Sequence, residues 1–148
     1  MGADYLKSRD HRWIEQLAKS MPYYQHLGIR LVRLNRGRSE LLLKITRSLT
    51  QSSGVAHGGV AASLIDSAVG LALCTLIGPD QMISTVEMKV NYLAPARPGL
   101  VRAAGIIIQK GKRVAVGEAS VFREQKLVAK GLVTYMILQG NRRSLPKG

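Results

Sequence analysis

The order of hydrophobic and polar positions divides the first third of the chain into a helix, a hairpin and a loop. Residues 8–20 carry Trp13, Ile14 and Leu17 at helical spacing, and Pro22 closes that segment. Residues 27–34 and 41–45 are short apolar runs on either side of a turn signal at 35–37, which is typical of a β-hairpin. Residues 47–56 are rich in Ser, Thr and Gly and predict a loop.

The second half of the chain has the pattern of four further strands. Residues 83–93 alternate with period two, and residues 100–109, 113–122 and 127–138 are β-rich runs joined by turn signals. In the first of these strands the apolar face carries Val86, Met88, Val90 and Tyr92. The polar face carries Thr85, Glu87, Lys89 and Asn91. Strands joined by short turns predict an antiparallel sheet.

Between the two groups of strands lies the longest apolar run, residues 58–78, which contains a single charged residue, Asp66. The run is long enough to span a bilayer, but a central aspartate costs about 2.5–3.5 kcal/mol for insertion. A buried helix is therefore favoured over a membrane span. The predicted fold is α+β, an antiparallel sheet wrapped around one central helix. We divide the chain into a helical segment (1–20), the main domain (21–138) and a basic tail (139–148).

Charge and cysteine content narrow the classes of function. The net charge is +13, which suits nucleic acid, an anionic membrane or an anionic small molecule. No block of five basic residues occurs and few aromatic residues are available to stack on bases, so an anionic small molecule is favoured over a polynucleotide. The only cysteine, Cys74, is expected to be buried and unreactive. The N-terminus has no signal-peptide pattern, and we expect a cytoplasmic protein.

Asp66 and the start of its helix are the candidate site for chemistry. At helical spacing Asp66 shares a face with small residues, namely Gly59, Ala62, Ser63 and Gly70, where another group could approach closely. The alternative is that Asp66 lies on a solvent-facing stripe or caps the backbone of a partner. His57-Gly58-Gly59 opens the helix, and free N–H groups at a helix N-terminus can bind a carbonyl oxygen that gains negative charge.

These residues carry a resemblance to a known family. The string from Gln51 through His57-Gly58-Gly59, followed by Asp66, resembles the signature of the PaaI-type hotdog thioesterases of the 4-hydroxybenzoyl-CoA thioesterase superfamily. Residues 84–96 are similar to the strand that follows the helix in that family. The similarity covers roughly residues 20–138 and implies the hotdog fold.

The resemblance also implies catalytic roles. Asp66 lies at the position of the catalytic carboxylate, which acts as nucleophile or as general base on water. Gly58 supplies the N–H that holds the thioester oxygen, the Gln51 amide orients water or the carboxylate, and Thr85 supplies a hydroxyl near the water. Glutamine is more typical of relatives with glutamate at the acid position, so direct attack and water activation both stay open.

Further residues are assigned to substrate binding. His57, Gly59 and Asn91 belong to the two motifs, and His57 is expected to shape the site rather than to act as a base. Arg97 and a basic turn (Lys110, Lys112 and Arg113) are candidate contacts for the phosphates of coenzyme A, with solvated surface charges as the alternative. No His/Cys/Asp cluster has metal spacing, so neither a metal nor a cofactor is expected, coenzyme A being part of the substrate.

The resulting hypothesis is a thioesterase that hydrolyses an aromatic or medium-chain acyl-CoA to the free acid and coenzyme A. The family shares its active sites between subunits, so a homodimer or homotetramer is expected. The alternatives are a non-catalytic acyl-CoA sensor, a hotdog enoyl-thioester dehydratase and a nucleic-acid binder.

Overall fold

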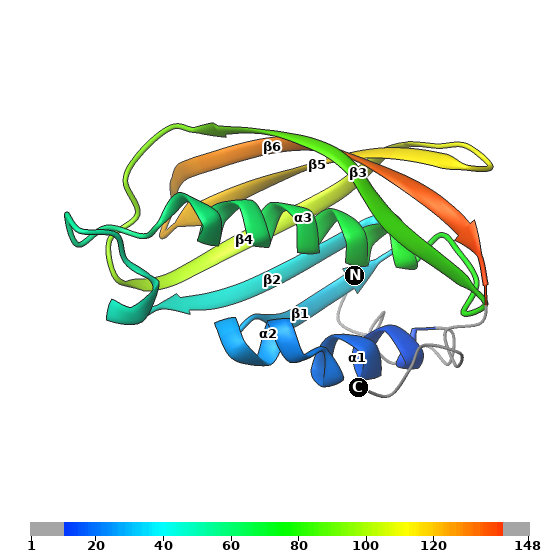
Figure 1. Cartoon of the computed structure of the whole chain (residues 1–148), viewed down its shortest axis with the longest axis horizontal. Coiled ribbons are helices and arrows are strands. Elements are labelled where there is room, and N and C mark those ends of the chain that lie inside the picture. Colours follow the sequence, from blue (N-terminus) through cyan, green and yellow to red (C-terminus); the bar gives the residue numbers. More distant parts are fainter. Residues whose placement is uncertain (1–10, 141–148) are drawn as a thin grey trace.

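A six-stranded antiparallel sheet curls around one long helix in the computed structural model, which describes residues 11–140 (Figure 1). The strand order is β1-β2-β4-β5-β6-β3, and the predicted α+β hotdog architecture is confirmed. The elements are α1 (Arg12–Ser20), α2 (Pro22–Leu27), β1 (Arg30–Asn35), β2 (Arg38–Ile45), the 3₁₀ turn η2 (Arg47–Leu49), α3 (Gly58–Cys74), β3 (Gln81–Tyr92), β4 (Gly99–Lys110), β5 (Val114–Arg123) and β6 (Lys126–Gln139).

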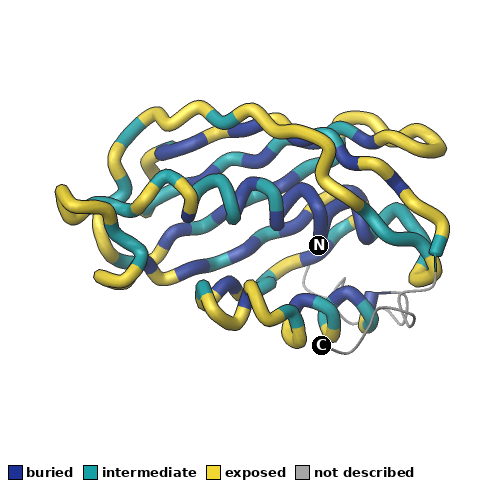
Figure 2. The backbone as a smooth tube through the Cα atoms, in the orientation of Figure 1, coloured by how far each residue is buried: buried dark blue, intermediate teal, exposed yellow. Residues whose placement is uncertain are grey.

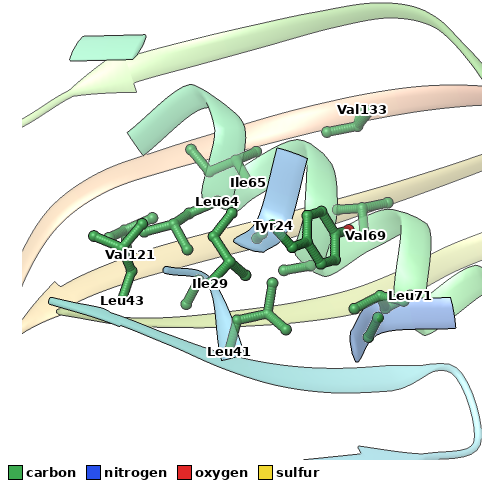
Figure 3. Packing of buried hydrophobic residues seen from close by; sticks show 14 of the residues in the cluster. Tyr24, Ile29, Leu41, Leu43, Leu64, Ile65, Val69, Leu71, Val121 and Val133 are labelled. Carbon is green, nitrogen blue, oxygen red and sulfur yellow. The ribbon is translucent and has the colours of Figure 1, made fainter. Parts of the chain in front are cut away.

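The core lies between α3 and the inner face of the sheet. Leu64, Ile65 and Val69 of α3 are completely buried there, and Val121 and Val133 meet them from β5 and β6 (Figures 2 and 3). The opposite side of α3 is less covered, and this side carries Asp66. The uniformly apolar sequence of the helix is thus explained by a sheet that surrounds it on most sides.

Glycine in the sheet lets the helix approach closely. A Cβ atom on Gly105 of β4 would lie 2.6 Å from the carbonyl carbon and oxygen of Ala68 in α3. At the same place the Ser39 hydroxyl of β2 donates a hydrogen bond to the Ala68 carbonyl oxygen at 2.6 Å. Helix and sheet are therefore fixed together at the level of residue 68, close to the middle of the helix.

This packing gives a stability prediction. Gly105→Ala is expected to destabilise the fold by about 1–3 kcal/mol, because the new methyl group meets backbone that cannot rotate away. Gly78→Ala is the matched control, since open space surrounds that position and no loss is expected there. Denaturant unfolding of both variants measures the difference. Equal stabilities would contradict the close helix–sheet contact.

The N-terminal prediction needs a correction at Pro22. The described part of the predicted helix 8–20 is α1, and residues 8–10 lie outside the described residues. Pro22 ends α1 but also opens a second helix, α2, since proline fits the first turn of a helix where its missing N–H costs nothing. The first strand consequently begins at Arg30 and not at residue 27. The proposed terminal segments 1–20 and 139–148 also lie partly outside the described residues.

The long apolar run ends as a helix earlier than predicted. Helix α3 stops at Cys74, and the Thr75 hydroxyl donates to the Ala72 carbonyl oxygen at 2.7 Å. The same hydroxyl accepts the N–H of Gly37 at 2.7 Å, which ties the β1–β2 turn to the end of the helix. Residues 75–78 are apolar but belong to the connection into β3.

Strand β3 forms an edge of the sheet. Within residues 11–140 it pairs with β6 alone, antiparallel and with an irregularity between Thr85 and Glu87, and it does not pair with β4, the next strand in the sequence. Its apolar side chains stay accessible: Val86 is 55%, Met88 39% and Tyr92 58% exposed. An edge strand with exposed apolar side chains is typical of a surface that pairs with another chain.

Candidate active site

Asp66 is held by two hydroxyl groups from neighbouring strands. Its Oδ1 atom accepts hydrogen bonds from Thr85 Oγ1 and from the Tyr135 hydroxyl, both at 2.9 Å. Thr85 and Tyr135 are register partners in the β3–β6 pair, so a single strand pairing supplies both donors. Within residues 11–140 no hydrogen bond reaches Asp66 Oδ2. Oδ1 is thus fixed by two hydrogen bonds, and Oδ2 is the oxygen that could contact a substrate or a water.

Tyr135 was missed by the sequence analysis. Its hydroxyl also lies 2.7 Å from the Asp66 carbonyl oxygen, and a Cβ on Gly70 would lie 2.8 Å from it, so glycine makes room for the phenol. Burial, and next the negative charge of Asp66, raise the pKa of Tyr135, so the hydroxyl remains a neutral donor. Gly70 on the Asp66 face was the one available sequence signal, and it does not name its partner.

We expect Tyr135→Phe to lower kcat roughly tenfold, the value of one hydrogen bond to a charged group. The ring and its packing are retained, so the melting temperature should change little. Steady-state turnover of this variant, compared with wild type at equal folded fraction, is the measurement. An unchanged kcat would mean that Thr85 alone orients the acid.

A cavity of about 740 Å³ lies beside Asp66. Its floor is the small-residue face of α3, including Gly59, Ala62, Ser63 and Gly70, as the helical spacing indicated. Helices α1 and α2 and strand β3 supply the walls, which include Leu17, Met21, Tyr24, Met82, Ile83 and Met88. Burial raises the pKa of Tyr24 to about 12, so its hydroxyl, hydrogen-bonded to Ser67, stays protonated.

The N-terminus of α3 carries the second group of predicted residues. His57 is the residue before the helix, and its Nδ1 atom accepts the N–H of Gly59 at 2.9 Å. His57 therefore caps the helix, and the Gly59 N–H is not free for a ligand. Within the described residues the Gly58 N–H has no hydrogen-bond acceptor. This N–H is the one that the helix start leaves for an oxyanion.

Gln51 lies at the same end of the molecule as Gly58. The two line a second cavity of about 410 Å³ together with His57, Tyr92 and Pro95. The Gln51 amide is turned onto its own loop, where Oε1 accepts the Ser53 N–H at 2.9 Å and Nε2 donates to the Ser53 hydroxyl at 2.7 Å.

The predicted catalytic residues thus form two clusters in one chain. Asp66 and Thr85 share the first cavity, and Gln51 and Gly58 share the second. Eight residues separate Gly58 from Asp66, which is roughly 12 Å along the helix axis. Asn91 lines neither cavity.

The basic residues chosen as phosphate contacts lie at opposite ends of the sheet. Arg97 is near the start of α3, because its neighbour Ala96 accepts the Ala56 N–H at 2.8 Å. Lys110, Lys112 and Arg113 form the β4–β5 turn at the far end of β4, roughly 36 Å away for a strand of this length (Figure 1). A single chain therefore does not bring Arg97 together with this turn.

Three further features concern residues 11–140. In this range no group of three or more His, Cys, Asp or Glu side chains converges as metal ligands would. No helix in the same range is both long and apolar enough to cross a membrane. Cys74 is buried and forms no disulfide within this range.

Comparisons with known proteins give the family. The model of the family described as "Thioesterase superfamily" matches residues 53–130, which include Gly58, Asp66 and Thr85. The chain is 31% identical to 1,4-dihydroxy-2-naphthoyl-CoA hydrolase of Listeria monocytogenes, over 70% of this chain and 85% of that protein. It is 29% identical to the medium/long-chain acyl-CoA thioesterase YigI of Escherichia coli, over 83% and 90%.

A solved structure shows the same relationship. The thioesterase family protein from Silicibacter pomeroyi superposes with a TM-score of 0.81 at 31% identity, over 86% of this chain and 96% of that chain. The fold, the motif positions and the extent of these matches agree. The chain is a thioester hydrolase of the hotdog fold and belongs to the thioesterase superfamily.

Proposed function

We propose that the protein hydrolyses acyl-CoA thioesters to the free acid and coenzyme A, with Asp66 as the catalytic carboxylate. The observation that carries this assignment is the hydrogen bonding of the Asp66 carboxylate, in which one oxygen is held and the other is not. Thr85 and Tyr135 hold Oδ1, while Oδ2 has no partner in the described part of the chain, and Asp66 lines a largely apolar cavity. A positioned carboxylate with one free oxygen can attack a carbonyl carbon or take a proton from water.

The geometry supports a site that two subunits complete together. A bound thioester needs its oxyanion donor and its nucleophile within about 3–3.5 Å of the reacting atoms. Gly58 and Asp66 of one helix are too far apart for this, but two α3 helices packed antiparallel across a twofold axis place Gly58 of the partner subunit beside Asp66. Two exposed apolar side chains of edge strand β3 lie beside these groups, since Met88 lines the cavity of Asp66 and Tyr92 lines the cavity of Gly58. We therefore propose a homodimer as the active unit, with a tetramer as its higher assembly.

The proposed reaction follows from these positions. The N–H of Gly58 of the partner subunit donates to the thioester oxygen as negative charge develops on it. Asp66 Oδ2 then attacks the carbonyl carbon, or removes a proton from a water that attacks it. In the direct route the carbon–sulfur bond breaks, the thiolate of coenzyme A leaves and takes a proton, and water then cleaves the anhydride formed on Asp66, which releases the acid and restores the carboxylate. In the water route the carbon–sulfur bond breaks in the same way, and the attacking water supplies the new oxygen of the acid. No cofactor or metal is needed.

The basic surface suits the same substrate. Coenzyme A carries phosphate charges, and a chain of net charge +13 raises the local concentration of such anions. Among the four candidate phosphate contacts, Arg97 lies nearest to Gly58, because the adjacent residue Ala96 is hydrogen-bonded to Ala56. We propose Arg97 as the phosphate contact beside the oxyanion donor.

The function is tested by incubating the purified protein with a panel of straight-chain and aromatic acyl-CoA thioesters and following the release of free thiol. We expect enzyme-dependent turnover with members of the panel. Enoyl-CoA hydration, assayed in parallel, is expected to stay at the background rate. Acyl-CoA binding without thiol release would overturn the proposal in favour of a sensor, and hydration in favour of a dehydratase.

A further inference from the structure

The cavity beside Asp66 continues past the acid along α3. Gly70, Leu71 and Cys74 line it on the C-terminal side of Asp66, over eight residues or roughly 12 Å of helix. Only residues 75–80 connect Cys74 to β3, and Met82, the second residue of that strand, lines the same cavity. Cys74 and Met82 therefore stand together at the end of the cavity that is farthest from Gly58.

The proposed dimer occupies the other end. If Gly58 of the partner subunit meets Asp66, the twofold axis passes near Ala62, midway between those two positions. Gly59, Ala62 and Ser63 then lie under the partner helix. The part from Gly70 to Cys74 lies beyond the start of that helix.

The chemistry of the lining identifies the kind of group that this space accepts. The walls beyond Asp66 are built from aliphatic and thioether side chains, namely Leu17, Met21, Leu71, Met82 and Ile83. The hydroxyls that line the cavity already have partners in the described structure: Tyr23 with Ser63, Tyr24 with Ser67, and Thr85 and Tyr135 with Asp66. Beyond Asp66, a hydroxyl on the acyl group would lose its water and meet mainly apolar side chains.

We propose that the acyl group is an unbranched, unsubstituted alkyl chain of roughly eight to ten carbons, which runs from Asp66 towards Cys74, and that Met82 sets its maximum length. The estimate is the length of extended chain that spans roughly 12 Å of helix. The flexible thioethers of Met21 and Met82 adapt to such a chain better than to a rigid ring. This inference rests on the proposed thioesterase function and adds the substrate class to it.

Met82 allows a test in both directions, because it is half-buried on the edge strand and outside the helix–sheet core. Met82→Trp should lower the ratio of kcat/KM for decanoyl-CoA to that for butyryl-CoA at least tenfold, a usual cost of a few methylenes without space. Met82→Ala should move the optimum to dodecanoyl-CoA or longer. Met136 of β6 is exposed and lines neither cavity, so Met136→Trp and Met136→Ala are the matched controls.

The readout is kcat/KM across straight-chain acyl-CoA thioesters from C2 to C16, with 1,4-dihydroxy-2-naphthoyl-CoA as the hydroxylated aromatic comparison. Opposite shifts in the two Met82 variants and none in the Met136 variants support the inference. An unshifted profile in both Met82 variants, or a higher wild-type kcat/KM for the hydroxylated aromatic, overturns it while leaving the thioesterase function standing. Absence of turnover with every thioester would instead overturn the proposed function, and the substrate class with it.

Discussion

Asp66→Asn is expected to lower kcat for acyl-CoA hydrolysis by roughly 10²–10⁴, the usual contribution of a positioned acid–base group. The substitution is well matched to the geometry. Asparagine keeps an Oδ1 atom that can accept the hydrogen bonds from Thr85 and Tyr135. Only the unpartnered Oδ2 is replaced, by an amide nitrogen that neither attacks a carbonyl carbon nor accepts a proton.

The control for Asp66→Asn is Asp80→Asn. Asp80 is an exposed acid in the connection before β3 and lines neither cavity, so its loss removes the same charge without touching the chemistry. Thiol release is measured for both variants alongside their melting temperatures. Wild-type turnover in a folded Asp66→Asn protein would refute the assignment of the acid.

The features that the sequence predicted well are those set by short-range spacing. The small-residue face around Asp66 follows from the 3.6-residue period of one helix, and the cavity floor has that composition. The helix start at Gly58 follows in the same way from the polar loop and the two glycines. The sheet around α3 could be predicted because an almost uniformly apolar helix must be covered on most sides.

The features that the sequence did not predict depend on long-range register. Tyr135 reaches Asp66 across 69 positions, through a pairing of β3 with β6 that skips the strands between them. Nothing in the local alternation of either strand indicates this neighbour. The orientation of the Gln51 amide onto Ser53 is a local choice among several rotamers, which a motif position does not specify.

Pro22 shows a different limit. The prediction that a helix ends before Pro22 was correct. Proline, however, also favours the first turn of a helix, and α2 begins at this residue. In the structure α2 follows Pro22, and Tyr24 of this helix is buried in the core beside α3 (Figure 3). Burial of this ring is a tertiary contact, and the local signals around Pro22 contain no information about it.

The arrangement of the two clusters predicts that mixed subunits recover activity that neither variant has alone. Asp66→Asn removes the acid, and Gly58→Val places a branched side chain at the oxyanion donor, where even a Cβ atom would lie 3.2 Å from the Tyr92 ring. Each homodimer then has two defective sites. In a heterodimer one interfacial site holds the intact Gly58 and the intact Asp66, and the other holds neither.

The expected result of mixing is about a quarter of the wild-type activity per site, because random pairing makes half of the dimers mixed and each mixed dimer has one intact site of two. The two variants are combined by co-expression with different affinity tags, and heterodimers are verified by their mass. Each variant purified alone, and the two mixed without subunit exchange, serve as controls. If verified heterodimers stay inactive, Gly58 and Asp66 do not act on the same thioester across the interface, and the acid would have to find its oxyanion donor within its own chain.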